Sequence, residues 1–133
     1  MKIQSLSVSR ILDAFGNPYK ENMFDLDRSE LELPVSMQNV LANIKQGLLE
    51  TNGILCVGTI DWHERRIAAL VVYGWNNYPI ELDVGIPSLD FYEHRIIDGV
   101  HRLAAAIVLG KKRIKSIISG ELSYAKELLR EKR

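Results

Sequence analysis

The sequence predicts a small α/β domain in which a mixed sheet is flanked by helices. Residues Ile80–Ile86 alternate between apolar and polar types, which is the pattern of a strand with one buried face. Apolar residues then recur at helical spacing over 100–108, directly after the β-branched pair Ile96–Ile97. Arg113–Ser119 is again strand-like. Strands and helices that alternate in this way are typical of a sheet covered by helices.

The length and composition favour a single domain, residues 1–133, of an intracellular protein. Of the 133 residues, 47% are hydrophobic, enough for a substantial core. Lysine plus arginine and aspartate plus glutamate balance at 17 each, so DNA is a weakly supported partner, possible only through local basic patches. The single cysteine, Cys56, excludes an intrachain disulfide. Neither a signal peptide nor an apolar run of about 18 residues is present, so we expect a soluble, cytoplasmic protein without membrane contacts.

The N-terminal third of the sequence predicts a strand followed by helices. Met1–Ser5 is a candidate strand, and Ser7 is a candidate N-cap for a helix that runs to Phe15. A short strand is plausible near 30–33, where leucines alternate with glutamates. Ser36 starts a helix that we expect to stop at Asn52-Gly53.

The middle of the chain predicts a strand or extended segment at Ile54–Ile60 and then a helix that ends near Trp75. Asp61, with Glu64 three residues on, resembles a capping box. Cys56 lies in the apolar run and is expected to be a small buried hydrophobe. Further on, we expect Gly110 to end the helix over 100–108 as its C′ residue, and 121–133 to form a terminal helix.

The segment Asp98-Gly99-Val100-His101-Arg102 is the main candidate for function. The first turn of a helix leaves amides unpaired at the positive end of its dipole, and a phosphate binds well there. Gly99, Val100, His101 and Arg102 are therefore the candidate phosphate-binding residues, and Asp98 and His101 are the candidate catalytic groups for proton transfer. In the alternative interpretation the segment is a structural turn, in which Asp98 caps the helix and Arg102 is a surface charge.

These residues, extended through Leu103-Ala104-Ala105, resemble the Asp-Gly-x-His-Arg box of the ParB/sulfiredoxin-like superfamily, and the resemblance covers about 79–120, with looser similarity upstream. The resemblance implies a small mixed sheet flanked by helices and a helix N-terminus that holds nucleotide phosphates. The implied ligands are ATP, ADP or CTP with Mg²⁺, or another phosphorylated small molecule.

Different members of this superfamily imply different activities for this chain. Sulfiredoxins carry a reactive cysteine where this chain has Val100, so sulfinic acid repair is not expected. ParB proteins have Glu-Arg where this chain has Val100-His101, and residues 111–133 are too few for a helix-turn-helix domain. The archaeal free-serine kinase shares the Asp-Gly-x-His-Arg form. Three hypotheses remain. The first is ATP- or ADP-dependent phosphotransfer or nucleotide hydrolysis, and the second is a non-catalytic ParB-like binding module, nucleotide-responsive or DNA-associated and linked to phage or plasmid functions. The third and weakest is sequence-specific DNA binding.

Glu81 and Asp83 are candidate metal ligands, because both project from the polar face of a strand that should lie beside the box. Asp83 is the favoured one of the two, and Asp98 is a third candidate. The competing interpretation is that both carboxylates are solvated positions of a half-exposed strand.

Two further positions carry weaker hypotheses. His63, with Arg65 and Arg66, lies at a helix start and could add an anion contact, but an exposed polar face is the favoured interpretation. Tyr92 could stack on a nucleobase.

Overall fold

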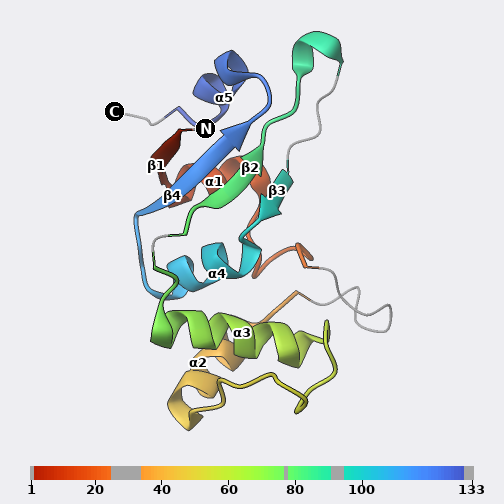
Figure 1. Cartoon of the computed structure of the whole chain (residues 1–133), viewed down its shortest axis with the longest axis vertical. Helices are drawn as coiled ribbons and strands as arrows, with labels where there is room; N and C mark the ends of the chain where they lie inside the picture. The colour runs from red at the N-terminus through yellow and green to blue at the C-terminus, as the bar shows by residue number, and fades with distance from the viewer. Residues whose placement is uncertain (1, 25–33, 77, 91–94, 131–133) are drawn as a thin grey trace.

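The protein is a mixed α/β domain built around a four-stranded sheet, as the sequence predicts. The computed structural model describes residues 2–24, 34–76, 78–90 and 95–130. The strand order is β1-β4-β2-β3, with β2 and β4 parallel and the two outer pairs antiparallel (Figure 1). The strands are β1 Ile3–Ser7, β2 Ile80–Asp83, β3 Arg95–Asp98 and β4 Arg113–Ser119.

Five helices surround this sheet in the described part of the chain. In Figure 1, α1 lies behind the strands, whereas α4, α3 and α2 follow one another below the sheet. Their bounds are α1 Val8–Phe15, α2 Met37–Gln46, α3 Ile60–Tyr73, α4 Val100–Val108 and α5 Leu122–Leu128, and a 3-10 turn covers Pro87–Leu89. No helix among the described residues combines the length and the apolar character that a bilayer crossing needs.

Helix α4 lies between two hydrophobic clusters and belongs to both. Leu103 and Ala106 pack into the cluster that lines the sheet, together with Ile80 and Leu82 of β2. Ala104 and Ala105 face the other cluster, whose remaining buried members come from α2, α3 and the segment before α2: Val35, Val40, Ile67 and Ala68. All four of these α4 side chains are fully buried. The alanines allow α3 to approach closely, and this fixes the position of α4 between sheet and helices.

Three helices begin with side-chain caps. Ser7 accepts a hydrogen bond from the amide of Arg10, and Ser36 from the amide of Asn39, as the sequence predicts for both. The cap of α3 is Thr59, not the predicted Asp61, because its hydroxyl accepts from the amide of Trp62. Each cap satisfies an amide that the first helical turn leaves without a partner.

The predicted Asp61–Glu64 capping box is not formed, because the Glu64 side chain faces the core and not the start of its own helix. Its carboxylate accepts hydrogen bonds from the Ser36 amide at 2.7 Å and from the Asn39 side-chain amide at 3.2 Å. Glu64 is buried, so it ties the start of α2 to α3.

Other element predictions need correction. Residues 54–59 form turns and coil, not a strand, and Cys56 within them is exposed. Helix α2 ends at Gly47, earlier than Asn52-Gly53. Strand β3 is a sheet edge and not a buried strand, with Ile97 48% exposed. The predicted strand near 30–33 lies outside the described residues.

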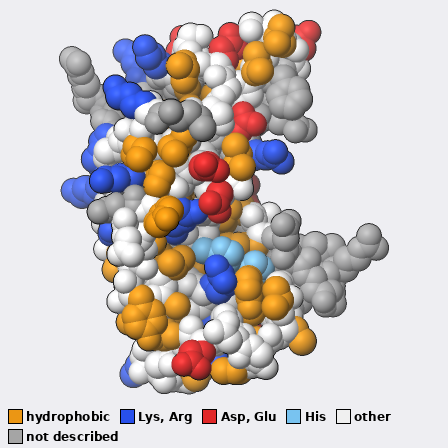
Figure 2. Space-filling model, viewed as in Figure 1, with side chains coloured by type: hydrophobic (Ala, Val, Ile, Leu, Met, Phe, Trp, Pro, Cys, Tyr) orange, Lys and Arg blue, Asp and Glu red, His pale blue; other side chains and the backbone are white. Residues whose placement is uncertain are grey.

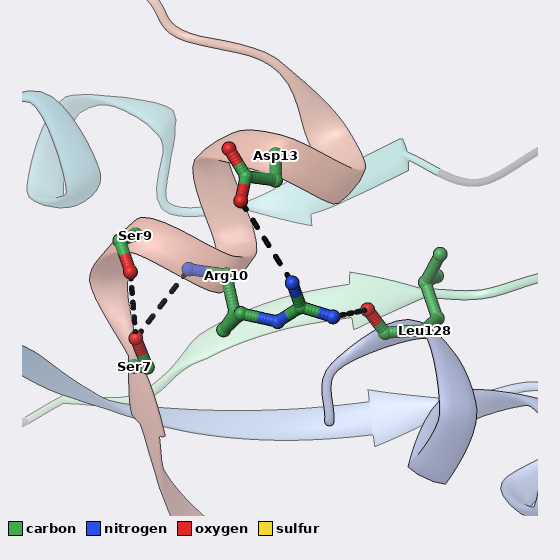
Figure 3. A network of polar contacts seen from close by, with 5 residues as sticks. All are labelled: Ser7, Ser9, Arg10, Asp13 and Leu128. Atoms are coloured by element: carbon green, nitrogen blue, oxygen red, sulfur yellow. Dashed lines mark hydrogen bonds and ion pairs between the residues drawn. The ribbon is translucent and has the colours of Figure 1, made fainter. Parts of the chain in front are cut away.

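The ends of the fold are joined by a polar network around Arg10 of α1. Its guanidinium donates to the Leu128 carbonyl of α5 at 3.3 Å and lies 3.9 Å from the Asp13 carboxylate (Figure 3). The half-buried Arg10 side chain therefore links α1 to α5.

Candidate functional site

The β3–α4 turn is held against β2 by Gly99. The glycine has a φ of 106°, and a Cβ atom there would lie 2.5 Å from Cγ2 and 3.1 Å from Cα of Ile80. Any side chain would both strain the backbone and displace β2. The sequence predicts Gly99 as a phosphate-binding residue, and the structure shows that a glycine is required there by the close approach of a neighbouring strand.

The N-terminal turn of α4 has no side-chain cap. Gly99 is the N-cap residue and offers no side chain, and the first helical hydrogen bond runs from the Leu103 amide to the Gly99 carbonyl at 2.9 Å. The amides of Val100, His101 and Arg102 precede that bond. Asp98 does not cap the helix, so the structural-turn interpretation is wrong in this detail. Uncapped amides at a helix start favour an anion.

Arg102 is anchored to the protein by two contacts of its guanidinium. Nη1 donates to the Pro79 carbonyl at 2.8 Å, and Nη2 lies 2.8 Å from an Asp98 carboxylate oxygen. The side chain is only 14% exposed, so it is not the surface charge of the alternative interpretation. Two of the five N–H donors of a guanidinium are thereby used, and the others remain for a ligand.

A pocket of about 640 Å³ lies beside this turn, and we call it the α4 pocket. This volume falls within the usual range for small-molecule sites. Its wall combines two cations, two carboxylates, aromatic rings and the start of α4. The lining residues are Arg66, Leu70, Trp75, Asn76, Tyr78, Pro79, Glu81, Asp98, Gly99, His101, Arg102 and Ile117.

Of the two predicted metal ligands, Glu81 and not the favoured Asp83 lies at this pocket. Glu81 pairs with Asp98 across β2 and β3, and both residues line the α4 pocket. Asp83 pairs with Arg95 further along, and its carboxylate accepts a hydrogen bond from the Gly85 amide. Among the described residues, no group of three or more His, Cys, Asp or Glu side chains is arranged to hold a metal.

His101 forms a close pair with His63 of α3. Nε2 of His101 and Nδ1 of His63 are 2.7 Å apart, and the two ring planes differ by 19° with centroids 4.9 Å apart, so the rings meet through these two nitrogens. Phe24 lies against both rings at 4.8 and 4.7 Å, and the Trp62 ring meets both with its plane nearly perpendicular. The pair is therefore fixed by aromatic packing from α3 and from the segment before α2.

The environment of His101 keeps its imidazole neutral. Burial is the largest cause, and the charges of His63, Arg66 and Arg102 act in the same direction, while Asp98 opposes them. Together they lower the pKa of His101 to about 3. At neutral pH the ring is therefore neutral, with one nitrogen that donates a hydrogen bond and one that accepts.

A second pocket of about 590 Å³ adjoins the α4 pocket, and we call it the histidine pocket. Asp98, Gly99 and His101 line both pockets, so they form a shared wall. The other lining residues are mostly apolar or aromatic: Met23, Phe24, Val57, Gly58, Trp62, His63, Arg95, Ile96, Ile97 and Val100. In Figure 2 the pale blue histidine side chains reach the surface at a hollow between acidic side chains and a basic one.

Sequence reasoning missed His63 as a site residue. It predicted an exposed polar face for His63, Arg65 and Arg66, but His63 is only 4% exposed. Arg66 lines the α4 pocket with its guanidinium 4.8 Å from the Trp62 ring, whereas Arg65 is turned to the Glu50 carbonyl. The predicted Tyr92 lies outside the described residues.

Comparisons of the chain with protein-family models, with curated proteins and with solved structures gave no significant match. The class that the fold defines is therefore a small mixed α/β domain with a two-pocket site at one helix start. The ParB/sulfiredoxin-like relationship stays a prediction from the Asp98–Arg102 box.

Proposed function

We propose that the protein binds a nucleotide, or another phosphorylated small molecule, in the α4 pocket. The observation that carries this proposal is that the uncapped start of α4 belongs to the wall of a ligand-sized pocket that also contains Arg66 and Arg102. Amides at a helix N-terminus and guanidinium groups are the usual protein partners of phosphate oxygens.

The remaining wall suits the other parts of a nucleotide. Trp75 and Tyr78 line the pocket, and Tyr78 is 69% exposed, so its ring is accessible to a base. Lys111 lies over the Trp75 ring at 4.6 Å and adds a cation beside the pocket. Tyr78 thus takes the stacking role that sequence analysis suggested for Tyr92.

The pocket also fits the Mg²⁺ that accompanies nucleotides. Glu81 and Asp98 supply two carboxylates, and Mg²⁺ in such sites typically binds one or two carboxylates with phosphate oxygens and water. Bound there, the ion would neutralise phosphate charge. Asp98 keeps its contact with Arg102, so Glu81 is the less engaged of the two carboxylates.

Nucleotide hydrolysis or phosphotransfer is the second candidate function, and the His63–His101 contact favours it. His101 lines the α4 pocket and contacts the buried His63, and the lone pair of its neutral ring is an acceptor for a proton, whereas a binding module needs no such pair. Release of phosphate from ATP or ADP with Mg²⁺ distinguishes the enzyme from a non-catalytic, nucleotide-responsive module.

Calorimetric titration with ATP, ADP, CTP and GTP, each with Mg²⁺, tests the proposal. We expect one of them to bind, and Arg66→Ala to weaken it about tenfold, since a charged hydrogen bond contributes about 1.5 kcal/mol or more. Arg65→Ala is the matched control, because it removes a neighbouring cation of α3 that does not line the pocket. No heat with any nucleotide or with inorganic phosphate would contradict the proposal, as would equal losses in both variants.

A further inference from the structure

We propose that His63 and His101 act together as a proton-transfer pair. In this proposal His101 takes a proton from a water molecule or hydroxyl group bound in the histidine pocket, and His63 positions His101 and takes up the resulting charge. The inference rests on the proposed function, because the hydroxyl is the nucleophile that would attack a phosphoryl group held in the α4 pocket.

The geometry of the pair supports a shared proton. The Nδ1–Nε2 separation of 2.7 Å is at the short end for a hydrogen bond between nitrogens, and the planes of the rings differ by only 19°. Phe24 and Trp62 pack on both rings and hinder rotation of either. A proton can therefore pass between the rings without a change of side-chain conformation.

Two protons move in the proposed transfer. In the resting pair, Nε2 of His101 donates to Nδ1 of His63, and Nδ1 of His101 carries a lone pair. When the hydroxyl O–H bond breaks, its proton goes to Nδ1 of His101 and its electron pair stays on oxygen. The proton between the rings then moves to Nδ1 of His63, so the positive charge ends on His63. As the hydroxyl oxygen bonds to phosphorus, the bond between phosphorus and the leaving-group oxygen breaks and its electron pair stays on that oxygen. The proton on Nδ1 of His101 then passes to the leaving-group oxygen or to water, and the proton on Nδ1 of His63 returns to Nε2 of His101, which restores the pair.

The linings of the two pockets indicate where the hydroxyl group binds relative to the histidine pair. His63 lines only the histidine pocket, whereas His101 lines both. The apolar wall formed by Phe24, Val57 and Trp62 suits water or a hydroxyl carried on an apolar body. Among the described residues, Nδ1 of His101 has no hydrogen-bond partner, so it is the nitrogen left for the hydroxyl.

Charged groups from several elements surround the pair. Arg66 of α3 and Arg102 of α4 disfavour a positive charge on His101, and Asp98 of β3 favours it. Arg95 lines the histidine pocket and Glu81 lines the α4 pocket. Because these cations act against a positive charge on His101, the proposed transfer needs a second ring that takes up the proton, and this is the physical reason for a pair in place of a single histidine.

Long-range ¹H–¹⁵N spectra of protein with ¹⁵N-labelled histidine test the pair without any ligand. We expect His101 to show one fixed tautomer at pH 7, with the proton on Nε2 and none on Nδ1. His63→Phe keeps an aromatic ring beside Phe24 and Trp62 but removes the acceptor, and we expect His101 to become a mixture of both tautomers. His63→Gln keeps an acceptor in reach, and it should restore the Nε2–H form.

A proton on Nδ1 of His101 in the wild-type protein would overturn the proposal, and so would an unchanged tautomer in His63→Phe. Calorimetry tests nucleotide binding separately from the proton-transfer pair, because His63→Phe leaves Arg66 and Arg102 of the α4 pocket in place. If nucleotides fail to bind but the tautomer behaves as expected, only the proposed function fails. Where phosphate release is measured, His63→Phe should lower kcat about 100-fold or more with little change in KM.

Discussion

At the scale of single residues, Gly99 shows how a motif residue can serve the fold and the site together. Its φ of 106° and its contact with Ile80 both exclude a side chain. The same turn leaves the first amides of α4 uncapped and places Asp98 where its carboxylate meets Arg102. Gly99 thus positions the box, although no ligand contact is needed to explain it.

Gly99→Ala should destabilise the protein by about 3 kcal/mol, from backbone strain plus displacement of Ile80. Gly47→Ala is the control, since Gly47 also has a positive φ, 72°, but its added Cβ would meet nothing within 4 Å. We expect that variant to lose only about 1 kcal/mol. Urea unfolding measures both, and equal losses would contradict the role given to Ile80.

The site could be predicted only in part, because one half of it depends on tertiary contact. The Asp98–Arg102 segment is contiguous, so its turn, helix start and charges are visible in the sequence. His63 lies 38 positions from His101, and polar residues at a helix start are normally solvated. No local pattern distinguishes a buried histidine there. The sequence also does not show that Glu81, and not Asp83, faces Asp98, because strand register decides this.

At the scale of elements, α4 connects the sheet to the helical layer. Its alanines, Ala104 and Ala105, face α3, while Leu103 and Ala106 face the sheet. The site lies where this helix begins, so its geometry depends on how closely α3 and α4 pack: His63 comes from one helix and His101 from the other.

Ala105→Leu should destabilise the protein by about 1–3 kcal/mol, because a larger side chain has no space between α4 and α3. The same substitution at Ala42, an exposed position of α2, should change stability by less than about 0.5 kcal/mol. Denaturant unfolding compares the two. An Ala105→Leu variant as stable as Ala42→Leu would show that the helices are not closely packed.

Elements that show a regular hydrophobic period or a capping residue could be predicted from the sequence. Elements that depend on pairing with other strands could not. The alternation over Ile80–Ile86 correctly predicts β2, and Gly110 ends α4 as expected. Residues 54–59 are apolar enough for a strand, but sheet neighbours decide whether such a run pairs. Likewise β3 is apolar yet lies at the edge, because sequence pattern does not reveal strand order.

At the scale of the whole molecule, His101 should make the fold sensitive to acid. Its pKa is about 3 in the folded protein, against 6.5 as the ordinary value in the unfolded chain. Below pH 6.5 the unfolded chain therefore binds a proton that the folded protein does not. This contribution to stability is complete above pH 6.5 and is lost as the pH falls toward 3, by about 1.4 kcal/mol per pH unit.

Urea unfolding of the wild type and of His101→Gln between pH 7 and 4 measures this contribution. The carboxylates titrate in both proteins, so the difference in slope reports on His101. We expect the free energy of unfolding to fall more steeply with acid in the wild type. Parallel curves for the two proteins would mean that His101 is protonated as easily in the folded state as in the unfolded chain.

The proposed function depends on one claim, that the amides at the start of α4 bind phosphate oxygens. Titration of nucleotide and Mg²⁺ into ¹⁵N-labelled protein, followed by amide chemical shifts, tests this claim most directly. We predict saturable shifts that are largest at the amides of Val100, His101 and Arg102, with smaller ones at Glu81. Unchanged amides at these positions, or shifts confined to another surface, would contradict it.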